Sequence, residues 1–295
     1  MASSSSQSPE STSNQAKLGQ SKFGQPQAAK SKKIKRNQWY SPTVSPEHGA
    51  YVVLAVSFLT GAAAAQQWTW TTTLALICAF CGFQAEHPLV LQIKQRSSWK
   101  PRFLVWASIY GGVAIAIAAW LFWLNPETWA LLMIYGAALV ATLVDGALVW
   151  QRQQKSRLNE LVTFAAVCLS APLAYIATTG MLPLPVVGLW LLNTLFFSSA
   201  IFTVKLRKVH TASVVPGLIF HLLATGTVAL LWQIHWLLPI TAAAFGVALL
   251  KFGLILWQKD WYCHTKIQYV AMLETSASLL FFAIAALSLL PPHLA

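Results

Sequence analysis

Long apolar segments alternate with short polar ones along most of this chain. A helix that crosses a bilayer needs about 20 mostly apolar residues, and nine segments of about that length follow one another. They lie at residues 48–65, 68–92, 103–124, 128–150, 160–180, 185–204, 213–233, 236–257 and 268–290. The pattern predicts an all-α integral membrane protein with about nine transmembrane helices in one bundle.

The basic residues orient these spans. Of the 20 Lys and Arg residues, all but Lys251 precede the first span or fall in alternate connecting segments, which places them on one side of a nine-span bundle. The positive-inside rule therefore predicts a cytoplasmic N-terminus and an outer C-terminus. The net charge of +12 follows from this topology, so we expect no nucleic acid among the partners.

Composition supports this class of protein and divides the chain in two. With 56% hydrophobic and 9% charged residues the chain has too few charges for a water-soluble domain. Residues 1–38 are rich in Ser, Gln and Lys and predict a disordered basic cytoplasmic tail, followed by a transmembrane domain at 39–295. We expect the tail and the inner loops to meet anionic lipid headgroups. The expected location is the plasma (inner) membrane, or a thylakoid membrane if the source is photosynthetic.

Ionisable residues within the spans gather in one layer near the predicted cytoplasmic face. Each costs at least about 2.5 kcal/mol to insert, and the deepest carboxylates lie about six residues, or roughly 9 Å, from the inner ends of their helices. We interpret the layer as a polar cavity open to the cytoplasm. Its candidate residues are Glu47, His48, Glu86, His87, Asp145, Asn159, Glu160, His221, Lys251 and Glu274.

A structural interpretation of some of these residues stays open. Lys251 reaches the interface by snorkelling in that alternative, while Glu47 and Glu160 stabilise helix N-termini through the helix dipole. This alternative explains Glu86 and Asp145 poorly. Pro88, directly after the Glu86-His87 pair, predicts a break in the second span.

Three motifs carry a resemblance to a known family. Pro-Glu-His-Gly-Ala-Tyr at 46–51, Glu-His-Pro at 86–88 and Arg-Leu-Asn-Glu-Leu at 157–161 resemble the YwiC-like family of bacterial membrane proteins. The resemblance covers most of residues 40–290 and leaves the tail outside. It implies a membrane topology and little chemistry.

The nine-span topology is also similar to that of the UbiA-type intramembrane prenyltransferases. That family has Asp-rich motifs after spans two and six, whose carboxylates hold Mg²⁺ against a prenyl diphosphate. Here residues 84–92 contain one carboxylate and residues 203–210 contain none, so we expect no Mg²⁺ site, assign no other metal, cofactor or catalytic residue, and leave enzymatic activity open. Lys205, Arg207 and Lys208 are candidates for direct phosphate binding, or are ordinary positive-inside residues.

Three functions fit the sequence. The first is binding or modification of a lipophilic isoprenoid-like or quinone-like molecule in a UbiA-like fold; an enzyme of this kind would be a transferase without the usual Asp-rich metal motifs. The second is proton-coupled transport of a small molecule, because buried carboxylates and histidines act as proton relays. The third is a membrane assembly factor that holds a partner with its basic tail.

Overall fold

The computed structural model describes residues 42–96, 98–124, 129–207 and 213–291 of the 295-residue chain. The predicted tail at 1–38 and the phosphate-binding candidate Lys208 lie outside the described residues.

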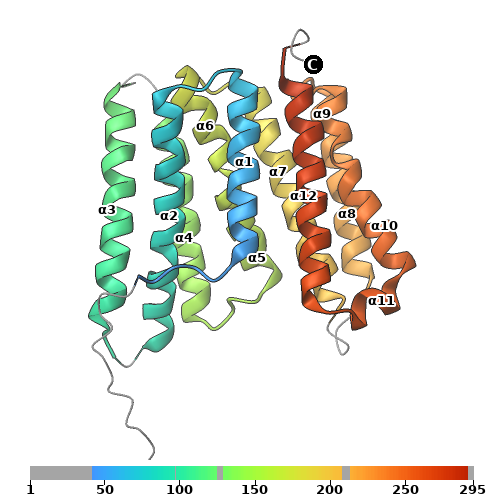
Figure 1. The fold of residues 1–295 in the computed structure, drawn as a ribbon, viewed down its shortest axis with the longest axis horizontal. Coiled ribbons are helices and arrows are strands. Elements are labelled where there is room, and N and C mark those ends of the chain that lie inside the picture. Colours follow the sequence, from blue (N-terminus) through green and yellow to red (C-terminus); the bar gives the residue numbers. More distant parts are fainter. Residues whose placement is uncertain (1–41, 97, 125–128, 208–212, 292–295) are drawn as a thin grey trace, which may run out of the picture. The chain divides into compact units, whose positions relative to one another are not determined.

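The described residues form helices without any strand (Figure 1). The helices are α1 (His48–Ala65), α2 (Trp70–Gln95), α3 (Pro101–Leu124), α4 (Trp129–Trp150), α5 (Arg157–Cys168), α6 (Ser170–Thr179), α7 (Leu184–Lys205), α8 (Val215–Gln233), α9 (Pro239–Ala243), α10 (Gly246–Trp257), α11 (Lys259–His264) and α12 (Ile267–Leu289).

Nine spans in the described part of the chain are long and apolar enough to cross a membrane. Seven are single helices; α5 with α6 makes the fifth span, and α9 with α10 makes the eighth. The predicted all-helical, nine-span class is therefore confirmed, with boundaries within about three residues of those expected. The side of the membrane on which each end lies stays a prediction.

A proline accompanies a helix interruption in the fifth span and not in the second span, where one was predicted. The expectation that Pro88 breaks the second span is wrong, because α2 continues from Trp70 to Gln95 with Pro88 buried inside it. The lost backbone hydrogen bond to the Gln84 carbonyl does not end the helix, which packs along its length on α3. The fifth span is interrupted at Leu169, three residues before Pro172, which cannot donate to the Cys168 carbonyl.

Helix α1 is central in this bundle and packs against α5, α6, α7 and α12 (Figure 1). Its contact with α6 is very close at Gly61, where a Cβ atom would lie 2.0 Å from the Ala171 carbonyl oxygen. The Ser170 hydroxyl donates to the Leu54 carbonyl at 3.3 Å beside this point. Close approach at a small residue is a typical means of helix association in membranes, where apolar side chains gain little by leaving lipid.

A buried polar cluster lies beside this contact at the middle of the spans. The Asn193 amide donates to the Thr60 hydroxyl at 3.1 Å, and the Ser57 hydroxyl lies 3.4 Å from the Asn193 carbonyl oxygen and 3.3 Å from the Cys168 sulfur. All four side chains are fully buried. Hydrogen bonds between helices therefore support the packing of α1, α5 and α7.

Candidate functional site

A cavity of about 1070 Å³ opens at the end of the bundle where α1, α5 and α12 begin and α2, α4 and α7 end, the lower end in Figure 1. Its walls are mostly apolar and include Val53, Val167, Phe197 and Val270. Solvent-exposed lining residues such as Glu47 and Lys155 lie at its mouth. The cavity is thus apolar inside and polar toward the basic loops.

One wall carries two carboxyl groups and an amide from three helices. Glu86 of α2 and Asp145 of α4 both line this wall, and their carboxyl groups lie near each other. Two carboxyl groups can hydrogen-bond to each other only when one of them carries a proton. The Asn159 amide donates to the Asp145 Oδ1 atom at 2.6 Å and to the Gln154 carbonyl at 3.3 Å. Asp145 and Asn159 are buried, with 7% and 4% of their surfaces exposed.

Local structure at the start of α5 fixes Asn159. Ser156 is the N-cap of this helix, and its hydroxyl accepts a hydrogen bond from the Asn159 backbone N–H at 3.2 Å. Glu160 follows in the first turn, where a carboxylate also favours the helix dipole. The cap therefore places an amide and a carboxylate on adjacent sides of the same turn.

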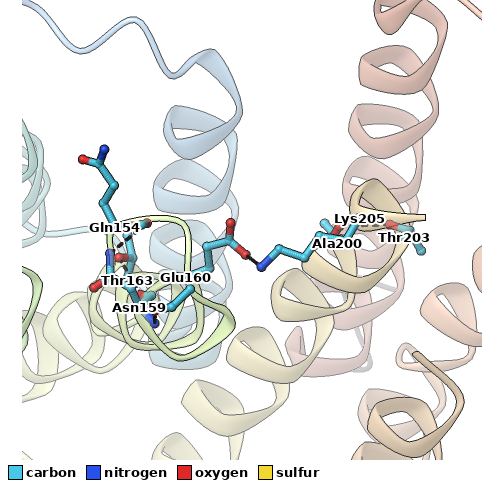
Figure 2. A network of polar contacts seen from close by, with 8 residues as sticks. Gln154, Asn159, Glu160, Thr163, Ala200, Thr203 and Lys205 are labelled. Atoms are coloured by element: carbon cyan, nitrogen blue, oxygen red, sulfur yellow. Dashed lines mark hydrogen bonds and ion pairs between the residues drawn. The ribbon is translucent and has the colours of Figure 1, made fainter. Parts of the chain in front are cut away.

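The opposite wall is joined to α5 by an ion pair. Figure 2 shows Lys205 at the end of α7 reaching across to Glu160 at the start of α5, and the two side chains are in contact. Thr163, one turn further along α5, donates to the Asn159 carbonyl at 3.0 Å. Lys205 is thus engaged by a carboxylate inside the cavity lining.

A second ion pair lies deeper, among α7, α10 and α12. The Lys251 ammonium group is 2.7 Å from Glu274 Oε2 and donates to the Ser199 hydroxyl at 3.2 Å. The Thr203 hydroxyl donates to the other Glu274 oxygen at 3.2 Å. The Lys251 side chain is only 3% exposed, so Lys251 does not snorkel to the interface but neutralises a carboxylate within the bundle.

The mouth of the cavity is held by the segment before α1. The Gln84 side chain accepts from the Ser45 backbone N–H at 3.2 Å and donates to the Tyr51 hydroxyl at 2.9 Å, and Tyr51 donates back to the Ser45 carbonyl at 3.0 Å. These bonds place Glu47 and His48 at the mouth, near the half-buried His87 of α2.

Eight of the ten cavity candidates line the cavity, and Lys251 contacts its lining through Glu274. His221 does not. Its ring stacks on Phe252 at 4.0 Å and its Nδ1 atom lies 2.7 Å from the Gly217 carbonyl, so it packs between α8 and α10. His221 lies at the depth predicted from its position along α8, but its side chain is on a face of α8 that points away from the cavity.

Of the two phosphate-binding candidates in the described residues, one lines the cavity and one lies outside it. Lys205 lines the cavity beside Glu160, whereas Arg207 donates to the Tyr262 and Thr265 carbonyls at 2.8 and 2.6 Å. The guanidinium carbon lies 5.6 Å from the centroid of the Tyr262 ring, whose hydroxyl is kept neutral because burial raises its pKa to about 12. Arg207 therefore fastens the end of α7 to α11.

Replacing Arg207 by glutamine should loosen the segment between α10 and α12. The variant loses two charge-assisted hydrogen bonds, each worth about 1.5–3 kcal/mol, and the cation–π contact. We expect trypsin to cleave after Lys259 and Lys266 at least tenfold faster than in the parent protein, by mass spectrometry of timed digests. Cleavage after Lys155, in the connection between α4 and α5, is the internal control, and an unchanged ratio between the sites would contradict this role.

Sequence reasoning missed several polar residues of the site. Thr203, Ser199, Gln154 and Gln84 orient the charged groups, and uncharged polar residues give little signal because many occur in spans without a functional role. Among the described residues no three His, Cys, Asp or Glu side chains come together in a group suited to hold a metal ion.

The fold and the cavity define an all-helical, multi-pass membrane protein with charged groups gathered at one end of its bundle. Residues 44–175, which run from before α1 into α6, match the family model described as YwiC-like protein. The resemblance drawn from the three motifs is thus confirmed over this part of the chain, which carries Glu47, Glu86, Asp145, Asn159 and Glu160. Searches of curated proteins and of solved structures gave no match.

Proposed function

We propose that this protein binds a lipophilic small molecule, isoprenoid-like or quinone-like, in the cavity at the basic end of its bundle. The observation that carries the proposal is the cavity itself: about 1070 Å³ of mostly apolar walls with polar groups toward one end. Small-molecule sites have this size and this combination of apolar lining with few polar groups. A molecule with an apolar chain and a polar end fits both parts.

The charged groups inside the cavity do not favour a diphosphate as the polar end, although Lys94 and Lys155 lie exposed at its mouth. Lys205 is paired with Glu160, Lys251 is paired with Glu274, and Arg207 contacts backbone carbonyls elsewhere. A diphosphate would bring more negative charge beside Glu86 and Asp145. The proposed function is therefore binding of a lipophilic molecule without a diphosphate.

Partly filling the cavity should weaken binding. Ala271 of α12 lines the cavity, and a phenylalanine there would occupy part of its apolar volume. We expect isothermal titration calorimetry on the purified protein to show binding of geraniol, or of a quinone with one isoprenoid unit, and Ala271→Phe to weaken it at least tenfold.

The matched control is Ala229→Phe, at an exposed position of α8 outside the cavity lining. It should bind like the parent protein. Equal binding by both variants would show that the ligand enters the surrounding detergent or lipid and not the cavity, and no binding by the parent protein would overturn the proposal.

A proton-coupled transporter is the second candidate, and the placement of Glu86 and Asp145 on one wall favours it because neighbouring buried carboxyl groups can act as a proton relay. The buried Ser57, Thr60 and Asn193 begin one helical turn beyond the Val53 lining and extend polar groups toward the other end. Solute-driven proton flux into proteoliposomes, lost in Glu86→Gln, would support transport; absence of flux at every pH would exclude it.

The assembly-factor hypothesis rests on the tail at 1–38, which lies outside the described residues. Deletion of residues 1–38 distinguishes this hypothesis from the other two, because a function based on the cavity should persist without them.

A further inference from the structure

Carboxyl groups outnumber their basic partners in the cavity. Five of them line it, and two form ion pairs with lysines. Within the described part of the chain, Glu47, Glu86 and Asp145 form no ion pair. Lys94 and Lys155 also line the cavity, but they are exposed at its mouth, where water solvates them.

Two amide groups of the same lining present acceptors without partners. The Asn159 Oδ1 atom is buried and accepts no hydrogen bond, although the amide nitrogen of the same side chain donates twice. The Gln154 Oε1 atom is also buried without a partner. A buried polar atom without a hydrogen bond costs about 1–3 kcal/mol, so each points to a missing donor.

We infer that this wall binds a positively charged amine, held by Glu86, Asp145 and the Asn159 carbonyl oxygen. The inference rests on the proposed function, because it names the chemistry at the polar end of the same lipophilic ligand. An ammonium group has up to three N–H donors and one positive charge, and the wall offers acceptors from α2, α4 and α5 with unpaired negative charge. A neutral quinone has no N–H or O–H donor to offer these acceptors and no charge to balance the carboxylates.

Binding of the amine displaces a proton. Both carboxyl groups line the cavity, and the inference includes one proton shared between them before the amine binds, which an ammonium N–H then replaces. The proton leaves to solvent through the open mouth, so one cation enters as one proton departs. The charged or titratable groups that line the cavity around this pair are Glu47 before α1, His48 of α1, His87 and Lys94 of α2, Lys155 before α5, and Glu160 of α5.

Geranylamine and geraniol test the inference, because they share a chain and differ in the charged group. On the purified full-length protein at neutral pH, we expect calorimetry to show geranylamine binding at least tenfold more tightly than geraniol. Titrations in two buffers of different ionisation enthalpy should show release of about one proton per bound amine. Geraniol should release none.

The variant Glu86→Gln/Asp145→Asn keeps the shape of the wall and removes its charge. It should lose the preference for the amine and the proton release, so that geranylamine and geraniol bind it with similar affinity. Asp260→Asn, at an exposed position of α11, is the matched control and should retain both.

The outcomes separate this inference from the proposed function. Equal affinity for both ligands without proton release, with both affinities lost in Ala271→Phe, would overturn the amine and leave the lipophilic site. No binding of geraniol, the quinone or geranylamine by the parent protein would overturn both. If the double variant does not fold, the inference is tested on the parent protein alone, by the affinities of the two ligands and the number of protons released.

Discussion

Gly61→Ala is expected to prevent stable assembly of the bundle. A Cβ atom at this position would lie 2.0 Å from the Ala171 carbonyl oxygen and 2.7 Å from its carbon, and real Cβ atoms do not approach so closely. Either α1 or α6 must move, which separates a contact at the centre of the fold. Overpacking of this kind costs about 3 kcal/mol or more, so we expect little monodisperse protein by size-exclusion chromatography and a strongly lowered melting temperature.

Gly226→Ala is the matched control, because a Cβ atom at that position of α8 meets no other atom within 4 Å. Alanine is favoured over glycine in helices by about 1 kcal/mol, so this variant should melt at or above the parent temperature. A Gly61→Ala protein that assembles and melts like the parent would show that the α1–α6 contact is less tight than described.

Lys251→Met should be the most damaging change among the charged residues. It leaves Glu274 with the Thr203 hydroxyl as its remaining hydrogen-bond partner inside the bundle, and removing one member of a buried pair costs about 3–5 kcal/mol. We expect a large fall in the denaturant concentration at half-unfolding, measured by far-UV circular dichroism in mixed micelles.

The double variant Lys251→Met/Glu274→Gln tests the reason for this loss. With both charges gone, much of the stability should return, because a neutral pair needs no compensation in a medium of low dielectric constant. Lys205→Met is a milder counterpart, since Lys205 and Glu160 are 19% and 32% exposed and water screens their interaction. A double variant as unstable as Lys251→Met would mean that Lys251 acts through packing and not through charge.

The spans were predictable because a bilayer imposes one length and one composition on every helix that crosses it. The basic residues added the alternation of loops and thereby the count of nine. The effect of proline was not predictable in the same way: Pro88 lies inside an unbroken α2, whereas Pro172 accompanies an interruption. Whether one lost hydrogen bond ends a helix depends on the neighbours that pack against it.

The depth of the candidate residues was also predictable, because counting residues from the helix ends gives their height in the membrane. Which face of the helix each side chain occupies was not. His221 shares the layer of Glu86 and Asp145 but packs on Phe252, outside the cavity. The pairing of Lys251 with Glu274, and of Lys205 with Glu160, likewise depends on how the helices are rotated about their axes.

The neighbours of α1 bear on how the protein is made. Helix α1 precedes every other described span along the chain, yet it packs against α12, the last of them, and against α6 at Gly61. Until the later spans are inserted, its polar residues Ser57 and Thr60 lack the hydrogen-bond partners on α5 and α7 that they have in the finished bundle. The packing of α1 thus becomes complete only after α12 has been made, and chains truncated before α12 leave one face of α1 open to recognition by membrane quality control.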